Sequence, residues 1–107
     1  MTIISFYKKN NLFLGYEVKG HTGKADRGED LLCCQISTVA QLGVVGVNEV
    51  EKANAFVEIS DGYLKLSLNE KQANKREVQS ILKTCYESFR SIVVDEKKYA
   101  KLEVKNV

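Results

Sequence analysis

The segment from Lys19 to Ser37 concentrates the residues of this chain that are best suited to chemistry. It holds the only histidine, His21, and two of the three cysteines, the adjacent pair Cys33 and Cys34. A thiolate at the start of a helix is favoured by the helix dipole, and an imidazole nearby can take the proton from the thiol. His21 and Cys33 together would therefore supply a nucleophile and its general base.

The spacing alone leaves two ordinary interpretations open. A histidine beside a strand is most often a surface residue, and a cysteine in an apolar helix most often packs as a small hydrophobic side chain. We expect this second role for Cys85, which lies in the middle of an apolar helical stripe.

Two other kinds of site are excluded by the same segment. Gly20, Gly23 and Lys24 suggest a phosphate-binding loop, but neither the glycine spacing nor the residue after the lysine fits that motif. One histidine and two adjacent cysteines, with no CxxC pair, form a poor zinc site. We therefore expect neither a metal nor another cofactor.

The composition of the chain is that of one ordinary globular domain spanning residues 1–107, with 44% hydrophobic and 28% charged residues. A net charge of +2 is too small for phosphate neutralisation to dominate binding, so we expect no direct contact with nucleic acid. The first residues do not resemble a secretory signal, and an odd number of cysteines suits free thiols in the cytoplasm. The apolar run Leu31 to Val47 contains several polar residues, so we predict a buried helix rather than a membrane span.

Two β-hairpins and two helices must position the thiol and the imidazole. Residues 2–7 and 12–18 form the first predicted hairpin, around Asn10 and Asn11, and residues 55–60 and 63–68 form the second, around Asp61 and Gly62. The first helix is predicted from Asp30 to about Lys52 and is apolar on most sides. A second, amphipathic helix follows a capping box formed by Asn69 and Gln72 and continues to Ile92, and a last strand covers residues 101–105.

The order β-β-α-β-β-α-β, with hairpins and no alternation of strand and helix, predicts an α+β fold. Such a chain forms a mostly antiparallel sheet on which both helices pack. His21 follows the second strand and Cys33 lies in the first turn of the first helix, so the loop between them can bring the two together.

The stretch GHTGKADRGEDLLCCQIS resembles the signature of the ribosomal-processing cysteine proteases. In that bacterial family a G-H-A-G-like turn is followed, across a glycine-containing loop, by D-[IV]-V-C-A-x-x-S. The eleven residues between histidine and cysteine are kept here, and the length and element order agree over nearly the whole chain. The matching positions are Gly20, His21, Gly23, Gly28, Asp30, Cys33 and Ser37.

The resemblance implies a cysteine endopeptidase that removes the N-terminal extension of a large-subunit ribosomal protein. Cys33 would be the nucleophile and His21 the general base and acid. The resemblance also implies aromatic and apolar residues before the cut, an apolar cleft beside the first helix, and a homodimer. Two departures are Leu31 and Leu32 in place of a β-branched pair, which conserves volume, and Cys34 at a position that usually holds a small residue.

The remaining residues of the motif each have a structural and a functional interpretation. Asp30 is expected to cap the first helix rather than to orient His21 directly. Ser37 lies on the same helix face as Cys33 and either bonds the substrate or bonds back to its own helix. The three glycines either allow the loop to change shape when substrate binds or only satisfy turn geometry.

Two further expectations concern the start of the first helix. Because neighbouring helix residues lie about 100° apart around the axis, Cys34 should point away from the cleft that Cys33 faces. The backbone N–H groups near Cys33 and Cys34 should be available to stabilise an oxyanion. Two rival functions remain open: a non-catalytic binding protein associated with the ribosome, and a redox sensor that uses the pair Cys33 and Cys34.

Overall fold

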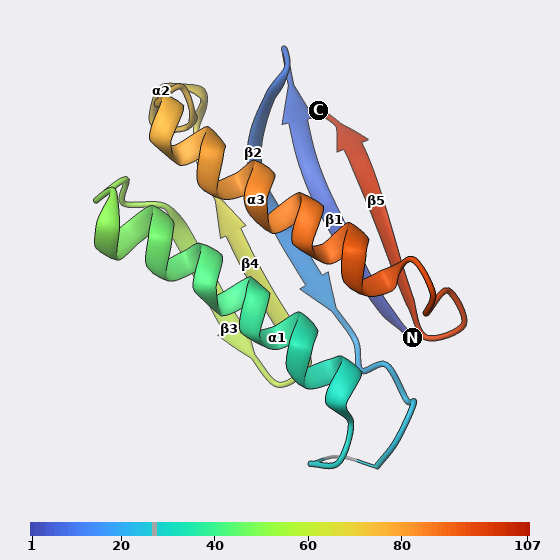
Figure 1. Cartoon of the computed structure of the whole chain (residues 1–107). Helices are drawn as coiled ribbons and strands as arrows, with labels where there is room; N and C mark the ends of the chain where they lie inside the picture. The colour runs from blue at the N-terminus through green and yellow to red at the C-terminus, as the bar shows by residue number, and fades with distance from the viewer. Residues whose placement is uncertain (27) are drawn as a thin grey trace.

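The computed structural model describes residues 1–26 and 28–107 and has the predicted α+β architecture. A five-stranded sheet in the order β3-β4-β2-β1-β5 is covered on one face by the helices (Figure 1). The elements are β1 (Thr2–Lys9), β2 (Leu12–Lys19), α1 (Leu31–Val44), η1 (Val45–Val50), β3 (Phe56–Ser60), β4 (Tyr63–Ser67), α2 (Glu70–Ala73), α3 (Arg76–Val93) and β5 (Ala100–Asn106).

The sheet is mostly antiparallel, as predicted, with one parallel pair. β1 pairs with β2, β2 with β4 and β3 with β4 in antiparallel register, whereas β5 pairs with β1 in parallel. Both predicted turns are confirmed: Asn10 and Asn11 have positive φ angles of 50° and 66°, and Gly62 has a φ angle of 66°. These turns place the carboxyl end of β2 beside the turn between β3 and β4.

The core lies between the sheet and the helices. Phe6, Tyr16 and Phe89 are fully buried and their rings lie within 5.1–5.9 Å of one another. The Tyr16 hydroxyl donates a hydrogen bond of 2.6 Å to the carbonyl of Ala40, which ties the sheet directly to α1. α1 is therefore held at a fixed height above the strands that carry the candidate site.

The helices depart from prediction in two places. After Val44 the first helix continues as a π-helix to Val50, whose turns are wider than those of an α-helix. The predicted capping box of Asn69 and Gln72 is confirmed, but it begins only the four-residue α2. The chain then breaks at residues 74 and 75, and the amphipathic stripe belongs to α3, a separate helix.

The first helix is covered on one side only. Its buried side, with Leu32, Ile36 and Ala40, contacts the core, but Leu31 and Leu42 are 78% and 65% exposed. A single copy of the chain therefore leaves the outward side of this mostly apolar helix uncovered. By length and composition Leu31–Val50 could cross a membrane, but a core helix passes the same test, and this one packs on a sheet.

Candidate active site

His21 lies just after β2, against the turn that joins β3 to β4. The N–H of Gly20 donates a hydrogen bond of 2.8 Å to the carbonyl of Gly62, and the Thr2 hydroxyl donates to the carbonyl of Gly20 at 2.9 Å. Nε2 of His21 lies 3.7 Å from Oδ1 of Asp61. A Cβ atom at Gly62 would lie 2.9 Å from Nε2, so a side chain at this position would displace the imidazole.

Asp30 organises the opposite side of the loop and confirms its predicted role as helix cap. One carboxylate oxygen accepts the N–H of Cys33 at 2.9 Å. The other accepts the hydroxyl of Thr22 and the N–H groups of Lys24 and Ala25, at 3.2 and 3.4 Å for the two N–H groups. The hydrogen bond from Thr22, followed by the backbone N–H of Cys33, lowers the pKa of the Asp30 carboxyl.

This arrangement answers the question of what orients His21. In the described part of the chain no hydrogen bond or ion pair joins Asp30 to the imidazole, and the carboxylate beside His21 is that of Asp61. Asp30 fixes the loop indirectly, because Thr22 follows His21 directly and its side chain is only 3% exposed. One carboxylate therefore holds both the start of the loop and the start of α1.

Cys33 and His21 line the same cleft, here called the hairpin-side cavity. A cavity of about 280 Å³ lies between α1 and the turn between β3 and β4, with the thiol of half-buried Cys33 and the imidazole on its wall. Its apolar lining is Val18, Ile36, Ala40, Ile59 and Leu64. These are the apolar cleft residues beside the first helix, which the sequence motif could not identify.

A second cavity, of about 380 Å³, lies on the loop side of the same two residues. It is lined by His21, Gly23, Ala25, Gly28, Asp30, Cys33, Cys34 and Ser37. His21, Cys33 and Ser37 line both cavities and so stand between them. An extended chain crossing from one cavity to the other would pass the thiol.

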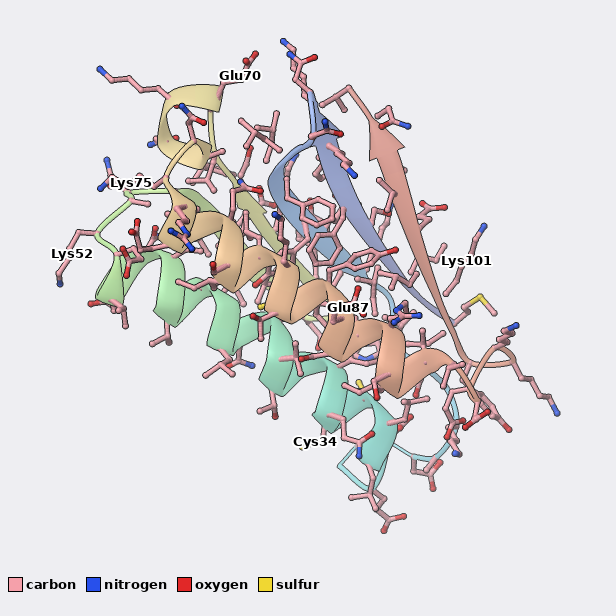
Figure 2. All side chains as sticks on the ribbon, turned by 45° about the horizontal axis from the view of Figure 1, so that its top comes forward. Cys34, Lys52, Glu70, Lys75, Glu87 and Lys101 are labelled. Carbon is pink, nitrogen blue, oxygen red and sulfur yellow. The ribbon has the colours of Figure 1, made fainter. Side chains whose placement is uncertain are left out.

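Cys34 is exposed and lines the loop-side cavity, near the end of α1 farthest from Lys52 (Figure 2). The expectation that it points away from the cleft therefore holds for the hairpin-side cavity only. The helical rotation between neighbours turns Cys34 out of the first cavity, and Cys34 lines the second while remaining exposed.

The side chains around Cys33 are already engaged with one another. The Ser37 hydroxyl oxygen accepts a hydrogen bond of 2.8 Å from the side-chain amide of Gln41, and both residues line the hairpin-side cavity. Thr38 is the residue that bonds back to its own helix, with its hydroxyl donating to the carbonyl of Cys34 at 2.8 Å. Ser37 thus keeps a polar atom at the cavity wall.

The predicted oxyanion donors are occupied in this structure. The N–H of Cys33 donates to the Asp30 carboxylate, and the N–H of Cys34 donates to the Asp30 carbonyl at 3.1 Å. In the state described here both N–H groups are therefore engaged within the helix cap. The cap itself uses the donors that an oxyanion would need.

The loop glycines all have backbone conformations that disfavour a side chain. Gly20, Gly23 and Gly28 have φ angles of 93°, 72° and 87°. A Cβ at Gly20 would also lie 2.5 Å from the carbonyl oxygen of Met1, whereas Gly23 and Gly28 face open space. Gly20 is thus needed for packing as well as for turn geometry, whereas no packing contact among the described residues requires a glycine at positions 23 and 28.

Thr22 and Asp61 are the residues that the sequence motif did not identify. Thr22 occupies the position where the family turn has a small apolar residue. Its hydroxyl group was the only feature of the sequence that could have indicated a hydrogen bond to Asp30. Asp61 was recognised as a turn residue, but its approach to His21 depends on a contact between segments forty residues apart. In the described residues no cluster of three or more metal-ligating side chains occurs.

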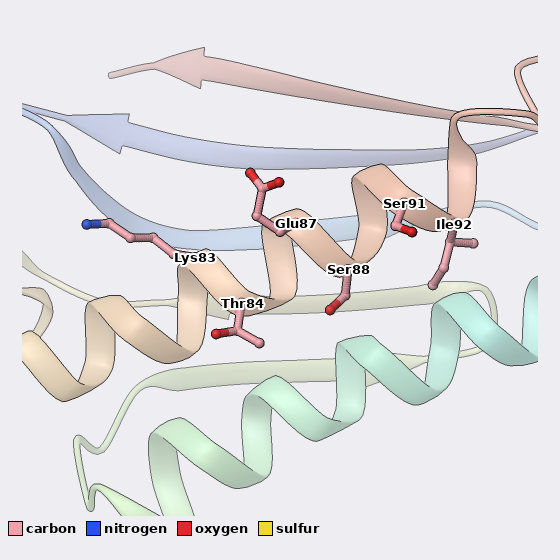
Figure 3. Close-up of a pocket in the computed structure, with 6 residues that line it drawn as sticks. All are labelled: Lys83, Thr84, Glu87, Ser88, Ser91 and Ile92. Carbon is pink, nitrogen blue, oxygen red and sulfur yellow. The ribbon is translucent and has the colours of Figure 1, made fainter.

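A larger hollow of about 610 Å³ on the surface of α3 has no part in this site. It is lined by Lys83, Thr84, Glu87, Ser88, Ser91 and Ile92 (Figure 3). It contains neither a thiol nor an imidazole. Cys85, on the same helix, is buried as predicted, and burial raises the pKa of its thiol to about 11.

A free cysteine in the first turn of a helix and a histidine that lines the same cavities are the residue types that a thiol hydrolase uses. The fold and the site together therefore define a small α+β protein with a site of the cysteine-protease type. The family model described as cysteine protease Prp matches residues 1–101, and the chain belongs to this family. Comparison with curated proteins gives no match.

Three solved structures share the fold. SMU.848 from Streptococcus mutans is 17% identical, with a TM-score of 0.86, and the match covers 100% of this chain and 96% of that one. An essential ribosomal processing protease Prp from S. aureus, in complex with a covalently linked product peptide, is 19% identical, with a TM-score of 0.90 and coverage of 98% and 100%. The S. aureus protease with a substrate peptide is 18% identical, with a TM-score of 0.83 and the same coverage.

Proposed function

We propose that this protein is a cysteine endopeptidase that removes the N-terminal extension of a bacterial large-subunit ribosomal protein in the cytoplasm. The observation that carries the proposal is the position of His21 and Cys33 on the walls of two adjoining cavities. Membership of the cysteine protease Prp family supports it, as does the S. aureus protease, which shares the fold and binds a substrate peptide.

In the proposed mechanism His21 takes the proton from the Cys33 thiol, and the sulfur attacks the carbonyl carbon of the scissile bond. His21 then gives the proton to the leaving amine, and a thioester remains on Cys33. His21 then takes a proton from water, and the oxygen attacks the thioester carbonyl carbon. The C–S bond breaks, the peptide leaves with its new carboxyl group, and His21 returns the proton to the Cys33 sulfur. Asp61 lies 3.7 Å from Nε2 and supports the imidazolium that forms in the first step.

The hydrogen bond between Asp30 and the N–H of Cys33 links the loop to the proposed mechanism. The oxyanion of the tetrahedral intermediate must compete with Asp30 for the N–H of Cys33, since that N–H already donates to the carboxylate. We infer that substrate binding shifts the loop and loosens this cap. Gly23 and Gly28 face open space and leave the loop room to move.

The two cavities suggest how a peptide is accommodated. The hairpin-side cavity has an apolar lining and suits aromatic or apolar residues before the cut. The loop-side cavity is lined by glycines, Asp30 and Cys34 and would take the residues after the cut. The scissile bond would then lie between them, at Cys33.

We also propose a homodimer formed through the outward side of the first helix. Leu31, Leu42 and Val45 are 78%, 65% and 48% exposed and lie on one side of the helix, away from the sheet. Apolar side chains that are regularly spaced on one helix face favour contact with another copy of the same face.

The test of the proposed reaction is mass spectrometry of the precursor ribosomal protein from the source organism. The precursor is incubated under reducing conditions with the wild type and with Cys33→Ala, His21→Ala and Cys34→Ala. A single cut in the N-terminal extension is expected with the wild type and with Cys34→Ala, and no cut with the other two variants.

Each rival function predicts a different outcome. A precursor that binds but stays intact with the wild type contradicts the protease and favours a ribosome-associated binding protein. Binding that changes when Cys33 and Cys34 are reversibly oxidised, and that does not require His21, favours a redox sensor. Cutting that is lost in Cys34→Ala but kept in Cys33→Ala assigns the attack to the other thiol.

A further inference from the structure

We propose that the residues before the cut add to the outer edge of β3 as a sixth strand, in an inference that rests on the proposed function. β3 is an end strand of the sheet, paired with β4 on one side only. Peptides commonly bind to such an edge, where main-chain hydrogen bonds give affinity and side-chain pockets give specificity.

The register of the hairpin shows which backbone groups of β3 are available. Ser60 and Tyr63 flank a two-residue turn and form a hydrogen-bonded pair. Pairs alternate along an antiparallel ladder, so Ile59 and Val57 occupy the non-hydrogen-bonded positions opposite Leu64 and Leu66. Their N–H and C=O groups therefore point away from β4, out of the sheet edge.

The side chain of Asn48 already forms hydrogen bonds of this kind with Ala55, just before β3. Ala55 is the next residue in this alternation, and its outward N–H donates to Oδ1 of Asn48 at 2.7 Å. Nδ2 of Asn48 donates in return to the carbonyl of Ala55 at 3.1 Å. The amide of Asn48 thus satisfies Ala55 as a neighbouring strand would, and Val57 and Ile59 follow without such a partner in the described residues.

The two edges of the sheet differ in their protection. β5 carries Lys101, Glu103 and Lys105 in alternation, and the two lysines lie 3.6 and 3.7 Å from the Glu103 carboxylate. Charges of this kind discourage pairing with another chain. β3 has a single charged residue, Glu58, and its Phe56 and Ile59 are 58% and 62% exposed.

The open edge leads directly into the candidate site. Ile59, Ser60 and Asp61, at the end of β3, line the hairpin-side cavity together with His21 and Cys33. A strand paired with Val57 and Ile59 would carry its next residues past Ile59 to the thiol. Because the hairpin-side cavity is the apolar one, the paired residues are those before the cut, and they run parallel to β3.

The experiment is a scan of backbone N-methylation in a synthetic peptide. The peptide covers the N-terminal extension and the first mature residues of the precursor, and the cut is first located with the wild-type enzyme. Binding is then measured to Cys33→Ala by fluorescence anisotropy, with one N-methyl group at a time over the six residues before the cut. N-methylation removes one donor and leaves the side chain unchanged.

The expected result is that the loss of affinity alternates from one peptide position to the next. Alternate positions should lose about tenfold or more in affinity, since a hydrogen bond is lost and a methyl group enters the sheet edge, while the intervening positions change by less than about threefold. Uniform tolerance, loss without alternation, or alternation only after the cut would overturn the inference. If the wild type does not cut the unmodified peptide or the precursor, both this inference and the proposed function fail.

A matched pair of enzyme variants tests the same contact from the other side. Ile59→Pro removes the outward N–H on an edge strand, where proline is tolerated, and Ile59→Val keeps it. Circular dichroism confirms that each variant is folded. Ile59→Pro should bind the unmodified peptide about tenfold more weakly than Ile59→Val, and equal affinities would contradict the pairing.

Discussion

At the scale of single residues, the carboxylate of Asp30 holds two parts of the site, although the motif suggests only a helix cap. Asp30 caps α1 through the N–H of Cys33 and holds the loop through Thr22. The thiol-bearing helix and the histidine-bearing loop are therefore fixed by one side chain. A change at position 30 should affect folding as well as any activity.

The charge of Asp30 should make part of the stability depend on pH. Its hydrogen bonds lower the pKa of the folded carboxyl, so this contribution is present above the unfolded pKa of about 3.9 and is lost as the pH falls through the folded pKa. We predict that Asp30→Asn, which keeps a cap but no charge, has a smaller free energy of unfolding than the wild type at pH 7. The difference should shrink in acid below the pKa of Asp30.

Urea denaturation of both proteins at neutral and acidic pH measures this difference. Glu103→Gln is the control, because Ser5 and two lysines lower the pKa of that carboxyl at the far edge of the sheet. It should show a similar pH dependence without a change in the loop. A constant difference between wild type and Asp30→Asn at all pH values would contradict the role of the charge.

At the scale of elements, the distance between α1 and the sheet is set by a glycine. A Cβ at Gly43 would lie 2.2 Å from the Tyr16 hydroxyl and 2.8 Å from the Cys85 sulfur. The same hydroxyl holds the carbonyl of Ala40. The helix can approach the sheet this closely only because position 43 has no side chain.

We predict that Gly43→Ala lowers the free energy of unfolding by about 1–3 kcal/mol, since it overpacks a site with no free space. Thermal or urea denaturation measures the loss. Gly46→Ala is the control, because its Cβ would meet only the flexible side chain of Ile81, at 3.1 Å. Equal effects of the two substitutions would show that helix propensity, and not contact with Tyr16, determines the result.

The elements themselves were largely predictable, because they depend on local patterns. Hairpin turns at Asn10 and Gly62 and the cap at Asp30 are encoded by a few adjacent residues, and all are confirmed. The break between α2 and α3 was missed, since the capping signal at Asn69 and the apolar stripe merge in the sequence. The π-helical turn at Val45–Val50 has no local signal that distinguishes it from an α-helix.

The site was predictable in its types of residue and not in its contacts. His21, Cys33 and Asp30 could be chosen from spacing and resemblance. The cavity lining and the approach of Asp61 to His21 depend on how β4 pairs with β2, which brings residues about forty positions apart together. The engagement of the Cys33 N–H by Asp30 followed from the cap, but its conflict with an oxyanion becomes visible only in the structure.

At the scale of the whole molecule, the helices cover one face of the sheet (Figure 1). The outer side of the first helix carries exposed apolar side chains. We predict that Leu42→Glu converts the proposed dimer to a monomer, because it places a charge in the middle of this face. Sedimentation velocity measures the oligomeric state. Val94→Glu, at an exposed apolar position on α3's carboxyl end, should leave it unchanged.

A wild type that is monomeric at micromolar concentration would contradict the homodimer. A Leu42→Glu variant that stays dimeric would contradict only the proposed interface. Neither outcome affects the proposed reaction, since Leu42 lines neither cavity.

The order of the residues along the chain has a consequence for how the site matures. The described residues that line the two cavities all lie between positions 2 and 64, whereas α3 and β5 follow later. During synthesis the parts of the cleft therefore leave the ribosome first. They gain their final geometry only when α3 supplies Phe89 to the core and β5 pairs with β1 across nearly the full length of the chain, a slow kind of contact. The thiol can therefore be exposed early, but the geometry of the proposed site is complete only after β5 has paired with β1.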